Sequence, residues 1–237
     1  MVPLNPQKSA KEVVGEAAAA LVESGMILGL GTGTTVDYFL TALAGRIQSQ
    51  GLVIKGVATS MATAEQCEKL GIEITTLADH PELDLVVDGA DEVDGQFRLI
   101  KGGGGALLRE KIVAAAGRKV VIIVSSDKLV ERLGATFLLP IEVMPFGYFA
   151  TLEKVARHGC QPFLRMTEDD EPFLTDNGNY IIDCKFPQGL EQIESLHASL
   201  SQIPGVAEIG LFIGLCDQVL EGCADGTLVV HEKNELF

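Results

Sequence analysis

The sequence predicts an α/β fold: a Rossmann-like domain with a parallel sheet, and a smaller α+β domain of the ferredoxin-like type. In the first half of the chain, short apolar β-type runs alternate with segments of helical spacing, which is typical of parallel βαβ units. The runs LDLVVD and VVIIV lack polar alternation, which indicates strands buried on both faces. After about residue 133 the order becomes βαββαβ, which suits a ferredoxin-like layer.

The larger domain is expected to comprise residues 1–133 together with 210–237. Its expected elements, in chain order, are a strand over 26–30, a helix over 36–47, a strand over 52–58, a helix over 61–70, strands over 72–77 and 83–88, a helix over 106–116 and a strand over 120–124. The final apolar run, LVVHE, is expected to return to this domain.

The smaller domain is expected over residues 134–209. Its strands are predicted at FLLPIEV, QPFLRM, NYIIDCKF and VAEIGLF, and its two helices over 148–158 and 189–202. Between two of these strands, Asn177 and Gly178 favour a type I′ hairpin turn. We expect this turn to have only a structural role.

The chain is acidic, and its charge narrows the classes of partner. Its 237 residues include 18 Lys and Arg against 33 Asp and Glu, a formal net charge of -15. This charge repels nucleic acids and anionic membrane surfaces, so neither is expected as a partner. Charged residues interrupt every stretch of about eighteen residues, which excludes an ordinary membrane span and leads us to expect a cytoplasmic location. The five cysteines are scattered without a CxxC pair, so we expect reduced thiols.

The segment Gly29–Thr35, GLGTGTT, lies between a predicted strand and a predicted helix. Free N–H groups at a helix start favour an anion, and three threonine hydroxyls add donors. The spacing does not fit the dinucleotide fingerprint, and no Gly-Lys-Ser/Thr follows, which also excludes a P-loop. We interpret the segment as a turn suited to one phosphate. A tight turn with threonine as the helix N-cap is the structural alternative.

The segment Asp88–Asp94, DGADEVD, directly follows the buried run LDLVVD. In open α/β sheets, ligands collect at the carboxyl ends of the strands. Four carboxylates in these seven residues also suit a solvated loop or a divalent cation. The EF-hand pattern fails because Ala90 occupies its third position, and we predict no metal site.

The segment Lys101–Lys111, KGGGGALLREK, places four consecutive glycines before a predicted helix. Glycines allow close approach of the backbone and let several N–H groups point at one oxygen. On the helix, Glu110 lies just beyond the first turn and faces either the core or the mouth of a site; a surface glutamate is the alternative. A weaker element, Ser125–Lys128, follows VVIIV and offers Lys128 to an anionic or hydroxyl-rich ligand; a surface lysine is the alternative.

These segments, in this order, resemble type A ribose-5-phosphate isomerases, whose pattern GxGTGST, DGADE and KGGGxALxREK is matched almost unbroken. The resemblance covers essentially the whole chain and includes EVMPF and TDNGN. Thr34 stands where many relatives have serine, which keeps the hydroxyl. The resemblance implies an aldose-ketose isomerase of the non-oxidative pentose phosphate pathway, which interconverts ribose 5-phosphate and ribulose 5-phosphate. It also implies that no cofactor is needed and that the chain forms a homodimer or homotetramer.

The resemblance implies roles for individual residues in the proton transfer. An aldose and a ketose interconvert through an enediolate, so one base must reach both carbons and donors must stabilise the oxyanion. Glu110 would be the base. Lys101 and the N–H groups of Gly102 and Gly103 would stabilise the oxyanion.

The remaining site residues are implied to bind the substrate. Asp88 would assist ring opening, and Asp91 would orient the sugar hydroxyls. The residues expected to bind are Lys11, Thr32, Gly33, Thr34 and Thr35 at the phosphate, Asp88, Gly89, Ala90, Asp91, Lys101, Gly102, Gly103 and Gly104 along the sugar, and Lys128.

The same motifs are also compatible with two other classes of function. An acyl-CoA transferase or a sugar-phosphate deaminase can share the architecture, because fold does not fix function. A non-enzymatic sugar-phosphate sensor would keep the Gly/Thr loop but could dispense with Glu110. The presence of Glu110 and of the complete KGGGG run favours the enzyme over the sensor.

Overall fold

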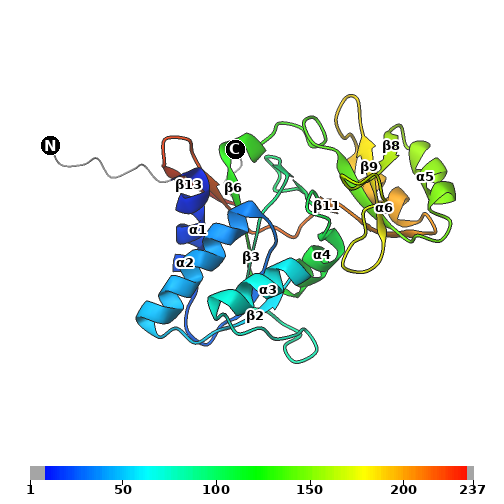
Figure 1. The fold of residues 1–237 in the computed structure, drawn as a ribbon. Coiled ribbons are helices and arrows are strands. Elements are labelled where there is room, and N and C mark those ends of the chain that lie inside the picture. Colours follow the sequence, from blue (N-terminus) through cyan, green and yellow to red (C-terminus); the bar gives the residue numbers. More distant parts are fainter. Residues whose placement is uncertain (1–8, 234–237) are drawn as a thin grey trace.

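The computed structural model of the protein describes residues 9–233, which form a larger and a smaller lobe (Figure 1). A six-stranded sheet forms the centre of the larger lobe. Its strands lie in the order β13 (Leu228–Glu232), β12 (Gln218–Gly222), β6 (Val120–Ser125), β3 (Leu85–Asp88), β1 (Ile27–Leu30) and β2 (Lys55–Ala58). Neighbouring strands are parallel except β12 and β13, which are antiparallel.

Helices cover both faces of this sheet. They are α1 (Ala10–Ala20), α2 (Thr34–Gln50), α3 (Met61–Leu70) and α4 (Leu107–Ala116). Because successive side chains of a strand point to opposite faces, neighbours on β3 belong to different cores. Val87 packs in the core formed with α1 and α2, whereas Val86 packs with Val113 of α4. The helix α4 therefore lies on the opposite face of the sheet from α1 and α2.

A four-stranded antiparallel sheet forms the smaller lobe. Its strands lie in the order β10 (Val206–Ile209), β7 (Leu139–Val143), β9 (Tyr180–Lys185) and β8 (Gln161–Leu164), with the helices α5 (Tyr148–Ala156) and α6 (Ile193–Ser201). Along the chain these elements follow the predicted βαββαβ order. The predicted fold class is confirmed: a Rossmann-like parallel sheet with a smaller ferredoxin-like α+β unit. The residues at which the chain divides into two domains stay a prediction.

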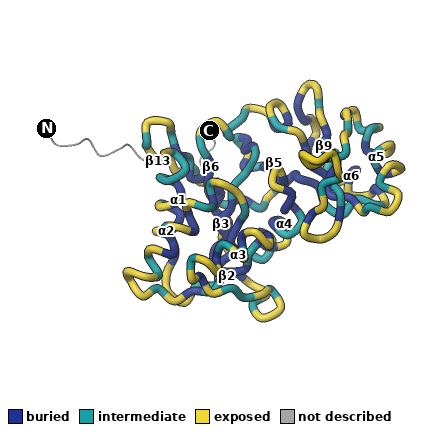
Figure 2. The backbone as a smooth tube through the Cα atoms, in the orientation of Figure 1, coloured by how far each residue is buried: buried dark blue, intermediate teal, exposed yellow. Residues whose placement is uncertain are grey.

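A short third sheet lies between the lobes. It contains β11 (Leu211–Phe212), β5 (Leu99–Ile100) and β4 (Glu92–Val93). The buried residues follow the inner strands of both larger sheets, whereas the edge strands β13 and β8 and many loops are exposed (Figure 2). None of the helices in residues 9–233 has the length and apolar character of a membrane span.

The predicted strand over 72–77 is wrong. Only an isolated bridge forms there, between Ile74 and Gly56 of β2. The chain then turns at Thr76, whose hydroxyl donates to Asp79 Oδ2 at 2.8 Å, so the segment cannot continue along the sheet edge.

The predicted type I′ turn at Asn177 and Gly178 is also wrong. A type I′ turn needs positive φ at both central residues, and here only Gly178 has it, with φ 73°. The Gly178 N–H donates to the Thr175 carbonyl oxygen at 2.9 Å. The loop is therefore one residue longer than predicted, with glycine in the left-handed position after the turn.

Candidate active site

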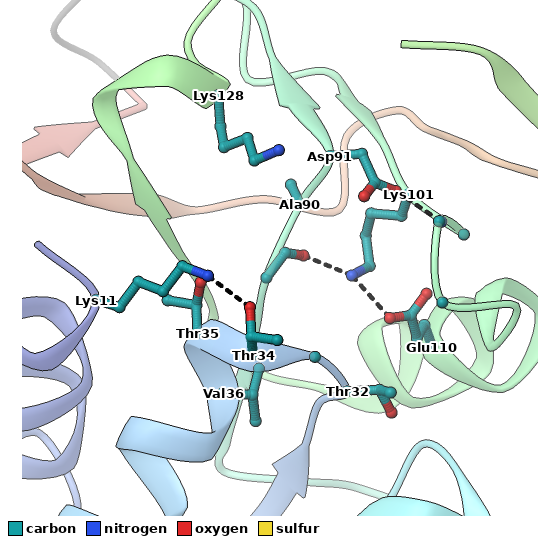
Figure 3. Close-up of a pocket in the computed structure, with 15 residues that line it drawn as sticks. Lys11, Thr32, Thr34, Thr35, Val36, Ala90, Asp91, Lys101, Glu110 and Lys128 are labelled. Carbon is teal, nitrogen blue, oxygen red and sulfur yellow. Dashed lines mark hydrogen bonds and ion pairs between the residues drawn. The ribbon is translucent and has the colours of Figure 1, made fainter.

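A pocket of about 200 Å³ lies where β1 and β3 pass into the glycine-rich and acidic segments (Figure 3). These strands are neighbours and parallel, so their carboxyl ends meet at one edge of the sheet. The glycine turn before α4 and the 3₁₀ turn η1 (Ser126–Lys128) complete the walls. The lining residues are Lys11, Thr32, Gly33, Thr34, Thr35, Val36, Gly89, Ala90, Asp91, Lys101, Gly102, Gly103, Gly104, Glu110 and Lys128.

Lys101 is the buried cation of this pocket. Only 4% of its side chain is exposed. Its Nζ donates to Glu110 Oε1 at 3.0 Å, lies 3.1 Å from Asp88 Oδ2, and also donates to the carbonyl oxygen of Gly89. Burial lowers the pKa of Lys101 and the two carboxylates raise it; the net shift is upward, so the ammonium stays charged at neutral pH.

Glu110 lies in the first turn of α4, and its carboxylate faces Lys101 in the pocket (Figure 3). Its Oε2 is buried and has no hydrogen-bond partner within residues 9–233. Burial raises the pKa of the Glu110 carboxyl to about 8, although the Lys101 ammonium lowers it. A carboxylate with one oxygen held and the other unpartnered can accept a proton from a bound substrate.

Asp88 lies behind Lys101 and does not line the pocket. Its Oδ1 accepts from the N–H groups of Gly89 at 2.8 Å and Thr32 at 3.1 Å, while its Oδ2 pairs with Lys101. Gly31 permits this packing, because a Cβ there would lie 2.1 Å from Asp88 Oδ1. These contacts orient Lys101, and the predicted role of Asp88 in ring opening stays a prediction.

Asp91 lines the pocket and also holds the glycine turn. Its Oδ2 accepts from the Gly103 N–H at 2.8 Å, and a Cβ at Gly103 would lie 2.6 Å from its Oδ1. The Gly103 N–H is therefore already used, which differs from its predicted role as an oxyanion donor. Burial raises the pKa of Asp91, in spite of the hydrogen bond from Gly103.

The opposite end of the pocket is formed by the start of α2 and two lysines. Gly33 precedes α2 with φ 123°, and no side chain caps the first N–H groups of the helix. Lys11 Nζ donates to Thr34 Oγ1 at 2.6 Å, and Lys128 reaches the same pocket from η1. In Figure 3, Lys11 and Lys128 lie across the pocket from Glu110. A helix N-terminus with two lysines is suited to a phosphate.

Thr32 lines the pocket, and its predicted contact with the phosphate stays a prediction. Its hydroxyl lies 2.7 Å from Thr59 Oγ1, 2.9 Å from Ser60 Oγ and 3.0 Å from Thr63 Oγ1. Figure 3 shows this side chain directed away from Lys11 and Lys128. The cluster ties the loop before α2 to α3, so Thr32 shapes the pocket and its hydroxyl is already engaged.

The last carboxylate of DGADE also serves the framework. Glu92 is buried and accepts from the N–H groups of Gly134 at 2.6 Å and Phe137 at 2.7 Å, on the segment that leads into the smaller lobe. Within residues 9–233, no three His, Cys, Asp or Glu side chains are grouped as a metal site requires.

Two features of the site were missed in the sequence. Arg165, directly after β8, donates to the carbonyl oxygens of Gly102 and Gly103 at 2.9 Å and 3.0 Å. The only signal was a basic residue in the apolar run QPFLRM. The hydroxyls that surround Thr32 were also missed, because serine and threonine near a helix start normally indicate only a cap.

Comparison with known proteins identifies relatives along the whole fold. The family model for ribose 5-phosphate isomerase A (phosphoriboisomerase A) matches residues 55–226. The ribose-5-phosphate isomerase A of Roseobacter denitrificans is 48% identical over 239 aligned positions, which cover 98% of this chain and 90% of that protein. That of Oceanobacillus iheyensis, named isomerase A 1, is 45% identical and is covered completely, over 95% of this chain.

Solved structures agree with these relatives. The ribose 5-phosphate isomerase from Plasmodium falciparum superposes with a TM-score of 0.92 at 35% identity, over 95% of this chain and 99% of that one. A D-ribose-5-phosphate isomerase in complex with phospho-erythronic acid superposes with a TM-score of 0.90 at 36% identity, over 94% and 97%. The extent of these matches, together with the site described above, shows that the chain belongs to the ribose 5-phosphate isomerase A family.

Proposed function

We propose that this chain interconverts ribose 5-phosphate and ribulose 5-phosphate, with Glu110 as the proton-transfer base. The single observation that supports this most is the buried Lys101–Glu110 pair, in which Glu110 Oε2 has no partner among the described residues. Across the same pocket stand Lys11, Lys128 and the start of α2, which suit a phosphate. A sugar phosphate that spans the pocket would place its reacting carbons beside Glu110.

The proposed reaction moves one proton between neighbouring carbons. With the sugar in its open form, Glu110 takes the proton from C2 of the aldose, and the C2 electron pair forms the double bond of the enediolate. The C1 carbonyl oxygen becomes negative and is stabilised by the Lys101 ammonium. Glu110 then returns the proton to C1, the proton of the C2 hydroxyl passes to the C1 oxygen, and the C2 oxygen becomes the carbonyl oxygen of the ketose. Lys101 thus counters charge that develops only during the reaction.

Asp91 is the better candidate for contact with the sugar hydroxyls. It lines the pocket, and its Oδ1 has no donor recorded among the described residues, whereas both oxygens of Asp88 are occupied. Because burial raises the pKa of Asp91, this carboxyl is better suited than an ordinary aspartate to exchange a proton during ring opening. We assign that step to Asp91 and the orientation of Lys101 to Asp88.

A direct assay tests the proposed function. Purified protein is incubated with ribose 5-phosphate, and the appearance of ribulose 5-phosphate is followed together with its reverse reaction. Conversion in both directions is expected. Absence of conversion by folded protein would overturn the proposal, and release of ammonia from an amino sugar phosphate or a CoA thioester on a glutamate would favour another enzyme class.

Two finer points belong to the same proposal. A cytoplasmic location fits a phosphorylated substrate, which does not cross membranes unaided. A homodimer or homotetramer is expected from the resemblance to the family, and light scattering of the purified protein measures it.

A further inference from the structure

Arg165 reaches from the smaller lobe to the glycine turn of the pocket. It lies directly after β8, and one nitrogen, Nη1, donates to the carbonyl oxygens of both Gly102 and Gly103. Arg165 does not line the pocket, so it contacts the outer side of the turn. Its side chain is 15% exposed, which places the guanidinium in a largely dry setting where such contacts are strong.

The guanidinium is itself fixed from behind. Its Nε and Nη2 donate to the two carboxylate oxygens of Asp183 on β9, at 2.8 Å and 2.6 Å. This bidentate pair fixes the plane of the guanidinium group and leaves Nη1 directed at the carbonyl oxygens of Gly102 and Gly103. The Phe173 ring lies 5.7 Å from the guanidinium carbon and closes the remaining side.

The orientation of the glycine peptides follows from these contacts. In a trans peptide, the C=O and N–H groups point in opposite directions. The peptide between Gly102 and Gly103 is held at both ends, by Arg165 at its carbonyl and by Asp91 at its N–H. The next peptide is held by Arg165 at the Gly103 carbonyl only, and within the described residues its Gly104 N–H has no recorded acceptor. That N–H therefore points away from Arg165, and Gly104 itself lines the pocket.

We propose that Arg165, fixed by Asp183, is a positioning residue that aims the Gly104 N–H at the substrate oxygen on which negative charge develops. The inference rests on the proposed isomerase function and adds the smaller lobe to the reaction. Without Arg165, the turn keeps the hydrogen bond from the Gly105 N–H to the Gly102 carbonyl and the contact of Gly103 with Asp91. The peptide between Gly103 and Gly104 would have no side chain to hold it, and glycine permits many backbone angles. The turn would then lose alignment while the phosphate end of the pocket stays intact.

Substitution of Arg165 tests this proposal through two inhibitors. Inorganic phosphate probes only the phosphate end, whereas phospho-erythronic acid, phosphorylated on its terminal hydroxyl, carries a carboxylate at the opposite end. In Arg165→Met we expect kcat to fall about tenfold to a hundredfold, since misplacement of a catalytic group by about 1 Å costs on that order. In the same variant, the inhibition constant of phospho-erythronic acid should rise, while that of inorganic phosphate should stay within about twofold of the wild-type value.

Arg98→Met is the matched control. Arg98 also pairs with a carboxylate, through Nε and Nη2 to Asp94 Oδ2, and it makes a further contact to Glu194 of the smaller lobe, but it touches no residue of the pocket. Its loss should leave kcat within about twofold. An equal loss of kcat in the two variants would overturn the proposal, as would an equal rise of both inhibition constants in Arg165→Met.

Two conservative variants keep the test decisive if Arg165→Met does not fold. Arg165→Lys keeps the charge but cannot hold Asp183 and two carbonyls at once, so an intermediate loss of kcat is expected. Asp183→Asn should also lower kcat, because an amide fixes the Arg165 guanidinium less firmly than a carboxylate does. Wild-type kcat in both variants would overturn the inference. Lack of isomerase activity in the wild-type protein is a separate outcome, which would overturn the proposed function itself.

Discussion

The two ends of the pocket use cations in opposite ways. At the reactive end, Lys101 and Glu110 have 4% and 6% of their side chains exposed, and they bind each other through Nζ and Oε1, whereas Glu110 Oε2 has no partner among the described residues. At the phosphate end, Lys128 is 36% exposed, and the contact between Lys11 and Thr34 lies at the surface. Burial strengthens electrostatic interactions and shifts pKa values, whereas exposed cations attract an anion with little effect on its chemistry. The reactive end should therefore control kcat, and the phosphate end should control binding.

The largest effect is expected from Glu110→Gln, which keeps size and removes the base. General-base catalysis supplies about 10² to 10⁴ in rate, so kcat should fall by that order. Inhibition by inorganic phosphate should change by less than about twofold, because the far end of the pocket is untouched. Steady-state kinetics of folded protein measures both.

Glu208→Gln is the control for that substitution. Glu208 pairs with Lys111 at 2.7 Å, as Glu110 pairs with Lys101, but neither member of this pair lines the pocket. Its replacement should leave kcat near the wild-type value. If the two variants lost activity equally, the loss would reflect a broken ion pair, and Glu110 would not be the base.

The next effect concerns pH. Glu110 must be deprotonated to accept a proton. Because its pKa is raised to about 8, Glu110 loses its proton at a higher pH than an ordinary glutamate. Below that pKa, kcat/KM should fall about tenfold per pH unit. The profile of kcat/KM for ribose 5-phosphate measures this. An inflection at the usual pKa of a glutamate, or a flat profile from mildly acidic to mildly basic pH, would contradict the environment described for Glu110.

A smaller effect is expected at the phosphate end. Replacing both Thr34 and Thr35 by alanine removes hydroxyl donors that lie far from the reacting carbons, so ground state and transition state should weaken alike. KM should rise about tenfold with kcat nearly unchanged. Thr41→Ala, which changes a threonine later in α2, serves as the control. A collapse of kcat at constant KM would mean that this loop takes part in the chemical step.

The smallest effect is expected from chelation. The proposed stabilisers of the enediolate are a lysine ammonium and backbone N–H groups, so activity should be unchanged after exhaustive treatment with EDTA. If EDTA abolished activity and magnesium or manganese restored it, Asp88, Asp91 and Glu92 would have to be interpreted as metal ligands.

Much of this comparison was accessible from the sequence, because it depends on local patterns. Strand and helix alternation predicted the parallel sheet, and the three motifs predicted which loops meet at its edge. The glycine run before α4 and the position of Glu110 near the start of that helix are likewise local features.

What the sequence did not reveal depends on contacts between distant residues. Asp88 lies behind Lys101 because it packs closely against Gly31, which follows β1, the neighbour of β3 in the sheet. The hydroxyl of Thr32 is turned by Thr59 and its neighbours, 27 positions away. Arg165 meets Gly103 across 62 positions and two lobes. No local propensity encodes such pairings, so they emerge only from the assembled fold.

The most direct test of the central claim is the exchange of the substrate C2 proton with deuterated water. A proton held on Glu110 between C2 and C1 is open to exchange with solvent in each turnover, so wild-type enzyme should place deuterium in the sugar phosphates, detectable by proton NMR. Glu110→Gln should lose this exchange together with turnover, while remaining folded and still binding inorganic phosphate. Exchange at the wild-type rate in folded Glu110→Gln protein would contradict the account, since another group would then be moving the proton.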